Sequence, residues 1–108
     1  MTIIQKIIKC FQKFTIYYTQ HAKREMENEE LGQILDAEVY QAICKGEIIQ
    51  EYPDDKPYPS VLIFGQTNNK RPLHIVCSYN NDEDIAIIIT VYEPNPNRWI
   101  DFKRRRIK

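Results

Sequence analysis

The chain has 108 residues, 43% of them hydrophobic, which is enough for one domain with one core and too little for two. Fifteen basic and fifteen acidic residues cancel to a formal net charge of zero, so net charge gives no argument for a nucleic-acid partner. Three separated cysteines without a Cys-x-x-Cys pair indicate reduced, buried thiols in a cytoplasmic protein, and no stretch approaches the ~20 apolar residues of a membrane span.

Residues 2–46 carry patterns typical of helices. Apolar side chains recur at helical spacing from Ile3 to Phe14, with lysines and glutamines between them, which predicts an amphipathic helix. We expect this helix to pack on a sheet, although its lysine-bearing face would also suit a membrane surface. Residues 16–18 then predict a short extended link or a small strand.

Two more helices are expected before residue 47. Thr19 is a good N-cap for the first of them. Asp36 is the N-cap candidate for the second, and Gly46 is its expected C-terminal stop.

Residues 47–93 predict a sheet of four strands. A first strand is expected over residues 47–52, and residues 60–79 form two strands around a tight turn. Residues 85–92 are almost wholly apolar, which indicates a strand in the middle of a sheet. The fold class is therefore α+β, with helices on one face of an antiparallel sheet and the other face partly open for a ligand.

Residues 94–108 predict a terminal turn and a basic tail. Trp99 and Phe102, three residues apart, suggest a helical turn that docks on the domain. Five of the last six residues are basic, from Lys103 to Lys108, and they would either bind phosphate or form a solvated terminus.

Two histidines are the first candidates for chemistry. His74 lies within a predicted strand, on the same side as Val76 and Ser78, where a structural role is the alternative. His21 opens a helix, where the helix dipole favours the neutral base, and it shares one side with Glu25. These residues lack the spacing of a metal site, so no metal or cofactor is expected.

Tyr92, Arg71 and Arg98 add the other groups that a metal-independent ribonuclease needs. Such an enzyme requires a base for the 2′-OH, an acid for the leaving 5′-oxygen and a cation for the phosphorane charge. The sequence contains these groups, and the fold decides whether they converge in one site.

Four motifs in order resemble domain-of-unknown-function family 4258 over residues 18–105. They are His21-Ala22-x-Arg24-Glu25-Met26, a proline-rich segment over residues 46–60, Arg71-Pro72-Leu73-His74-x-Val76, and Ile89-Thr90-Val91-Tyr92-x-Pro94-x-Pro96-x-x-Trp99. That family looks like part of the RelE-like and barnase-like group of small ribonucleases, many of them bacterial toxins paired with antitoxins.

The resemblance implies a RelE-like fold, with N-terminal helices on a four-stranded antiparallel sheet, and metal-independent RNA cleavage. It also implies a small zinc-finger antitoxin of the YgiT type as partner, beside RNA. By motif position, the implied catalytic set is His21, Arg24, His74 and Tyr92. The implied phosphate contacts are Arg71, Arg98, Arg104 and Arg105.

The leading hypothesis is therefore a toxin-type ribonuclease that forms a 2′,3′-cyclic product. The alternative is a non-catalytic protein-interaction domain of the same fold, which would dock a partner through an exposed sheet face or edge. The ribonuclease hypothesis requires His21 and His74 to reach one pocket, so the geometry of these two residues separates the alternatives.

Overall fold

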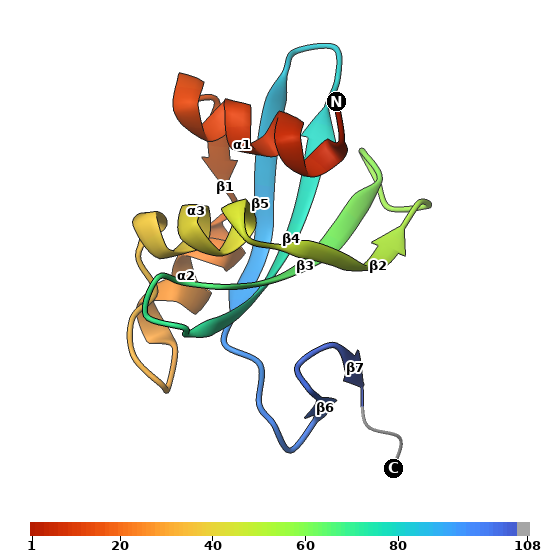
Figure 1. Ribbon diagram of the computed structural model, residues 1–108. Helices are drawn as coiled ribbons and strands as arrows, with labels where there is room; N and C mark the ends of the chain where they lie inside the picture. The colour runs from red at the N-terminus through yellow and green to blue at the C-terminus, as the bar shows by residue number, and fades with distance from the viewer. Residues whose placement is uncertain (106–108) are drawn as a thin grey trace.

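The computed structural model describes residues 1–105, with the three helices and most of the strands in the predicted order (Figure 1). The elements are α1 (Ile3–Lys13), β1 (Ile16–Tyr18), α2 (Gln20–Asn28), α3 (Asp36–Cys44), β2 (Glu47–Tyr52), β3 (Ser60–Gln66), β4 (Pro72–Asn80), β5 (Ile85–Tyr92), β6 (Trp99–Ile100) and β7 (Arg104–Arg105). Within residues 1–105, no helix is long and apolar enough to cross a membrane.

The main sheet has five strands in the order β1-β5-β4-β3-β2, which corrects the predicted count of four. The four longer strands pair antiparallel, as predicted. The fifth strand is β1, which pairs parallel with β5 in the register Ile16↔Ala86. The sequence left residues 16–18 open between a link and a strand because three residues carry too little alternation to decide.

The predicted hairpin over residues 60–79 is confirmed as β3 and β4. Its turn is closed by Thr67 N–H donating to the Arg71 carbonyl at 2.9 Å, with Lys70 at a positive φ of 65°. β4 is the central strand, and β5 lies beside it. The apolar strand β5, expected in the middle of the sheet, is an inner strand next to the central one. Within residues 1–105, the edge of β5 that faces away from β4 pairs with another strand only along β1.

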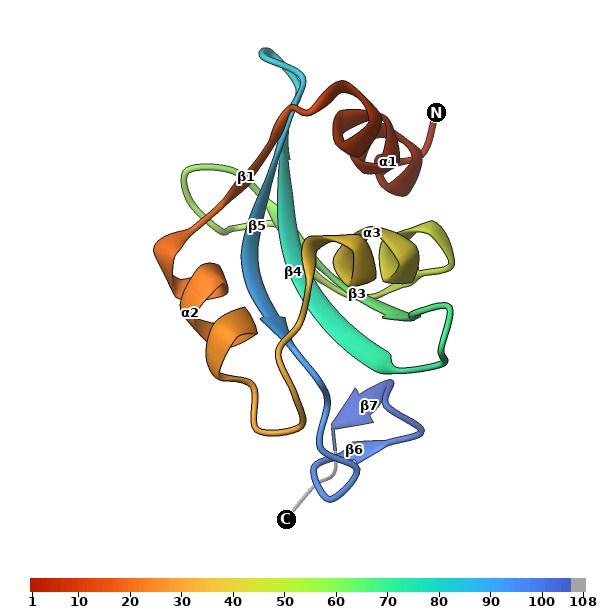
Figure 2. The ribbon, with the colours of Figure 1, turned by 90° about the vertical axis from the view of Figure 1, so that its left-hand side faces the viewer.

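Side chains of β4 alternate between the core and the opposite face of the sheet. Leu73, Ile75 and Cys77 belong to the apolar core with α1 and α3, which lie together on one side of the sheet (Figure 2). His74 and Val76 point the other way by the two-residue period of a strand. Of the three cysteines, Cys10 and Cys77 are buried as predicted, whereas Cys44 is exposed.

α3 lies very close to β3. A Cβ atom on Gly65 would sit 1.8 Å from the carbonyl oxygen of Ala42, so only glycine allows this approach. The N-terminus of α3 differs from the prediction, because Leu35 is the N-cap and Asp36 is the first helical residue. Thr19 is confirmed as the N-cap of α2 and accepts a hydrogen bond from Ala22 N–H at 3.0 Å.

The C-terminal segment is a second, two-stranded sheet in place of the predicted helical turn. Trp99 pairs with Arg105 across β6 and β7. The connecting turn places Asp101 and Phe102 at positive φ values of 52° and 62°, and Lys103 N–H closes it on the Ile100 carbonyl at 3.0 Å. Arg106 and Lys108, which were predicted to continue the basic tail, lie outside the described residues.

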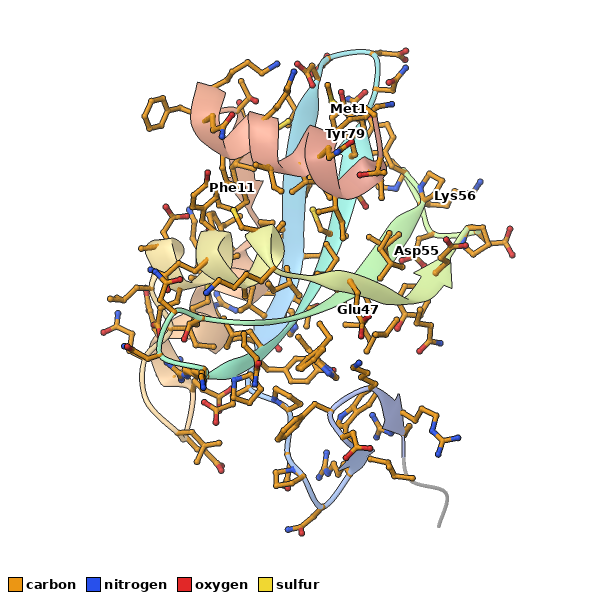
Figure 3. The ribbon with its side chains drawn as sticks, in the orientation of Figure 1. Met1, Phe11, Glu47, Asp55, Lys56 and Tyr79 are labelled. Atoms are coloured by element: carbon orange, nitrogen blue, oxygen red, sulfur yellow. The ribbon has the colours of Figure 1, made fainter. Side chains whose placement is uncertain are left out.

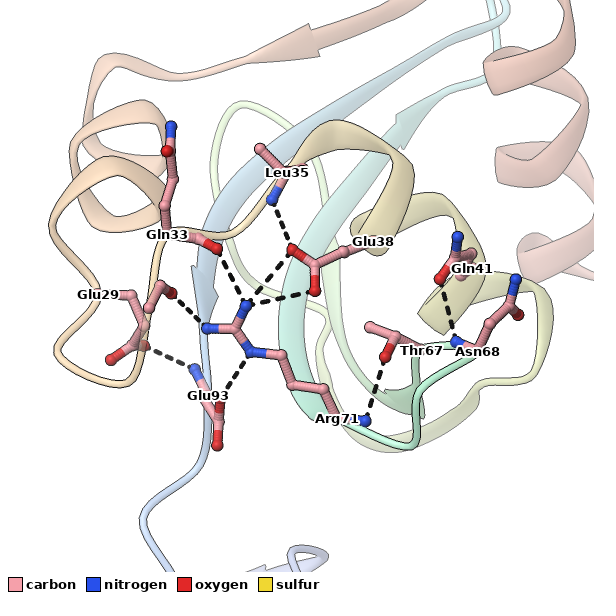
Figure 4. Close-up of polar contacts among 10 residues, drawn as sticks. Glu29, Gln33, Leu35, Glu38, Gln41, Thr67, Asn68, Arg71 and Glu93 are labelled. Carbon is pink, nitrogen blue, oxygen red and sulfur yellow. Dashed lines mark hydrogen bonds and ion pairs between the residues drawn. The ribbon is translucent and has the colours of Figure 1, made fainter.

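Arg71 ties the connection between α2 and α3 to the end of the sheet (Figure 4). Its Nε donates to Glu93 Oε1 at 2.6 Å, and one terminal nitrogen donates to the Gln33 carbonyl at 3.0 Å and lies 3.3 Å from Glu38 Oε2. The other terminal nitrogen donates to the Gly32 carbonyl. The side chain is only 17% exposed, so these contacts are made largely out of water.

Replacing Arg71 with Met should lower the free energy of unfolding by about 2–3 kcal/mol, because two carboxylates and two carbonyls lose a charged donor. Urea unfolding followed by circular dichroism measures the loss. Arg24→Met, on the exposed face of α2, is the matched control and should change stability by less than about 0.5 kcal/mol. Equal effects of the two substitutions would contradict the role given to Arg71.

Candidate functional site

A pocket of about 480 Å³ lies where α2, the end of β5 and the β6–β7 hairpin meet. It is lined by Glu29, Glu30, Tyr92, Glu93, Asn95, Arg98, Trp99 and Arg105. Three of the residues predicted to act on RNA, Tyr92, Arg98 and Arg105, are therefore brought together here. We call this feature the hairpin pocket.

The hairpin pocket contains charges of both signs. Arg105 lies over the Trp99 ring, with Cζ 5.6 Å from the ring centroid, and within residues 1–105 neither Arg98 nor Arg105 pairs with a carboxylate. Glu93 is held by Arg71, and Glu29 accepts a hydrogen bond from Glu93 N–H at 2.8 Å. The two guanidinium groups are thus available for an anionic ligand.

His74 lies beneath the wall of the pocket and is completely buried. Its Nε2 is 2.5 Å from the Phe102 carbonyl, which can only accept, so this nitrogen carries the proton. Its Nδ1, 3.0 Å from the Tyr92 hydroxyl, must then accept. Burial lowers the pKa of His74 from its ordinary value, although the hydrogen bond to Phe102 opposes the shift. The ring is therefore neutral at pH 7.

The Tyr92 hydroxyl donates to His74 and stays protonated at neutral pH. Burial raises the pKa of Tyr92 to about 12, with a smaller contribution from Tyr52, while the charge of Arg105 opposes the increase. Tyr92 is only half-buried and lines the hairpin pocket, so its ring connects buried His74 with the solvent-accessible residues.

His21 lies on α2 and pairs with Glu25. The two side chains approach at 3.3 Å between His21 Nε2 and Glu25 Oε1, and the imidazole is 67% exposed. Glu25 also accepts a hydrogen bond from Val91 N–H at 3.0 Å, one residue before Tyr92. Burial raises the pKa of Glu25, and the hydrogen bond from Val91 opposes this. A carboxylate that orients an exposed imidazole is typical of a histidine base. Among the described residues, His21 and His74 do not line one pocket: His74 is buried beneath the hairpin pocket, and exposed His21 is not among the lining residues.

The other predicted site residues also lie elsewhere. Arg24 is exposed on α2, and Arg104 is exposed on β7. Arg71 is engaged by Glu93 and Glu38, so a phosphate would have to displace a carboxylate to bind it. No group of three histidine, cysteine or acidic side chains that could hold a metal ion occurs in the described part of the chain.

Glu29, Glu93 and Trp99 shape the pocket, and sequence reasoning did not place them there. Glu29 lies four residues after Glu25, so helical spacing gave a usable signal for its position beside Glu25. Glu93 and Trp99 reach the pocket because the chain turns back after β5. The sequence of this segment has no periodic pattern that would have predicted this path.

The sequence pattern of the family described as "Domain of unknown function (DUF4258)" matches residues 18–93. The matched segment contains His21, Arg71, His74 and Tyr92, whereas the β6–β7 hairpin follows it. Comparison with curated proteins and with solved structures found no match.

Glu25 should stabilise the fold as a hydrogen-bond acceptor, independently of its charge. We expect Glu25→Gln to stay within about 0.5 kcal/mol of the wild type at neutral pH, and Glu25→Ala to lose about 1–2 kcal/mol because the Val91 amide loses its partner. Chemical denaturation at several pH values measures both effects.

The same variants test the pKa of Glu25. Because this pKa is raised in the folded state, the contribution of Glu25 to stability is present at low pH and is lost as the pH rises from 4.5 through the folded value. Wild type should therefore lose stability relative to Glu25→Gln over that window. A parallel pH dependence of the two proteins would contradict the raised pKa.

Proposed function

The chain belongs to the DUF4258 family, and from this premise we propose that it is a metal-independent, toxin-type ribonuclease of a bacterial cytoplasm with a RelE-like fold. The observation that carries the proposal is the hairpin pocket, where Arg98 and Arg105 lack carboxylate partners within the described residues and lie beside Tyr92 and Trp99. Guanidinium groups bind phosphates through paired hydrogen bonds, and aromatic rings accept stacked bases of single-stranded RNA.

The His21–Glu25 pair supplies the proposed base. With Nε2–H directed to Glu25, the free Nδ1 of the exposed ring is left to take the proton of a 2′-OH group. The 2′-oxygen then bonds to phosphorus, the bond from phosphorus to the 5′-oxygen breaks, and a 2′,3′-cyclic phosphate forms. The hydrogen bond from Val91 N–H to Glu25 fixes α2 beside β5, one residue before Tyr92. His21 does not itself line the hairpin pocket, so the substrate would have to extend from the pocket along α2 to reach it.

Tyr92 is the proposed donor to the leaving oxygen. Its hydroxyl is protonated at neutral pH and would turn from His74 to the 5′-oxygen as the bond breaks. Arg98 and Arg105 would stabilise the charge on the phosphorane. His74 is buried and hydrogen-bonded at both ring nitrogens. Its proposed role is to orient Tyr92 and the hairpin, and it takes no proton from the substrate.

A protein-binding domain is the competing proposal, and the free edge of β2 favours it. In residues 1–105, β2 pairs only with β3, so its outer edge has no neighbouring strand. Unpaired strand edges accept an extended segment of another protein. Exposed Glu47 and Glu51 lie on this strand, and a zinc-finger antitoxin of the YgiT type is the partner that the family resemblance suggests.

We expect the purified protein to cleave a labelled single-stranded RNA in the presence of a metal chelator. His21→Ala should slow cleavage about 100-fold, because the base is lost. Arg98→Ala with Arg105→Ala should raise KM, because phosphate binding is lost, and should also lower kcat, because the phosphorane charge loses its stabilisation. The measurement is the appearance of a 2′,3′-cyclic phosphate end, and Lys9→Ala on the exposed side of α1 is the control.

Induced expression in a bacterial host gives an independent readout. Growth arrest and RNA loss with the wild type, but not with folded His21→Ala, would support the ribonuclease. A folded wild type that neither arrests growth nor cleaves RNA would overturn it and favour the protein-binding domain.

A further inference from the structure

The β6–β7 hairpin is attached to the main sheet by few contacts. It forms its own two-stranded sheet, without backbone pairing to the five-stranded sheet in the described residues. Side chains supply the attachment: Trp99 packs edge-on against the His74 ring at 4.4 Å, and Phe102 stacks on Phe64 at 6.2 Å. Lys103 Nζ pairs with Glu47 Oε1 at 2.8 Å, at the end of β2 nearest the hairpin (Figure 3).

The turn of this hairpin is strained. Asp101 and Phe102 both adopt positive φ. Aspartate is common at the first such position of a two-residue hairpin turn, but glycine usually occupies the second, so the strain lies at Phe102. The same geometry directs the Phe102 carbonyl to His74 Nε2. The hairpin therefore combines an unfavourable backbone conformation with few contacts to the main sheet. Segments with these properties open locally.

The hairpin also builds one wall of the hairpin pocket. Trp99 and Arg105 belong to its strands, and Arg98 directly precedes them. The opposite wall comes from α2 and the end of β5, through Glu29 and Tyr92. The two walls form one pocket only while the hairpin lies against the sheet.

His74 is the polar contact at the centre of this attachment, and its complete burial beneath the hairpin favours the neutral ring. Protonation would place a second N–H at Nδ1, so the Tyr92 hydroxyl would have to stop donating and accept instead. The hydrogen bond to Phe102 would remain, and the loss of hydration of the charged ring is what opposes protonation. The new charge would lie in a buried cage formed by Phe64, Tyr92 and Trp99.

Nearby charged groups do not offset a proton on His74. Arg105 and Lys103 of the hairpin have the same sign, and Glu47 on β2 is already paired with Lys103. Glu25 on α2 is engaged by Val91 N–H and His21. Within residues 1–105, His74 contacts no carboxylate.

We propose that His74 is a positioning residue whose neutral ring latches the β6–β7 hairpin to the sheet, so that gain of a proton releases the hairpin and opens the hairpin pocket. The latch rests on the burial of His74 beneath the hairpin and on its hydrogen bond to Phe102; only its effect on RNA binding rests on the proposed function. Burial lowers the pKa of His74 from 6.5, so the latch is closed at neutral pH and opens in acid.

Trp99 reports the state of the latch because it is the single tryptophan of the sequence. We would measure acrylamide quenching of its fluorescence from about pH 8 to about pH 5, together with far-ultraviolet circular dichroism to establish that the domain stays folded. The wild-type quenching constant should rise about twofold towards acid pH as Trp99 leaves its buried position.

His74→Gln is the matched variant, because a glutamine amide can donate to Phe102 and accept from Tyr92 but does not titrate. Its quenching should stay constant with pH. His21→Gln removes the other histidine and should keep the wild-type profile. Quenching that is independent of pH in the wild type, or that changes equally in folded His74→Gln, would overturn the latch.

RNA binding separates this inference from the proposed function. The probe is a labelled 2′-O-methyl oligouridylate, which the enzyme cannot cleave and which does not titrate in this range, followed by fluorescence anisotropy. Its affinity should fall about fivefold or more from pH 7.5 to pH 5.5 in the wild type only. A Trp99 transition without oligonucleotide binding at any pH would sustain the latch and reject the ribonuclease, whereas binding with an unchanging Trp99 would reject the latch.

Discussion

The ion pair between Arg71 and Glu93 holds together parts of the chain that share no regular structure. Arg71 lies in the turn before β4, and Glu93 follows β5. The Arg71 guanidinium also donates to the carbonyl of Gln33, in the connection between α2 and α3. The pair sits behind the hairpin pocket and neutralises one of its three glutamates. The guanidinium that the family resemblance assigned to phosphate thus supports the scaffold, and the cations exposed to a ligand come from the C-terminal segment.

The two-residue period of β4 separates the residues of the apolar core from His74 at the candidate site. Its odd-numbered residues fill the core under α1 and α3, and His74 faces the opposite side between Phe64 and Tyr92, which lie level with it on the neighbouring strands. The family match ends at residue 93, so the hairpin that covers His74 lies outside the matched residues. The pocket therefore combines residues of the family segment with residues that follow it.

The long elements could be predicted from the sequence because their signals are local. Alternation and turn residues located β3 and β4, and the apolar run located β5. The pairing of β1 with β5 could not be predicted, because contact between residues 16 and 86 depends on the whole fold. The helical turn predicted from Trp99 and Phe102 was wrong for a related reason. A spacing of three residues fits a helical turn, and the hairpin turn at Asp101 lacks the glycine that usually marks a hairpin. The candidate site residues could be identified by their chemical type. Whether they lie close together depends on the register of the strands, which cannot be read from the sequence alone.

The edge of β5 beyond β1 has a further consequence. Strand edges with free amides are templates on which other chains add in fibrils. Here Glu25 and Glu29 of α2 accept the Val91 and Glu93 amides, and Thr19 donates to the Ile89 carbonyl. These two carboxylates accept the backbone hydrogen bonds that a neighbouring strand would otherwise accept. Another chain would have to displace two carboxylates to extend the sheet there, which protects this very apolar strand from aggregation.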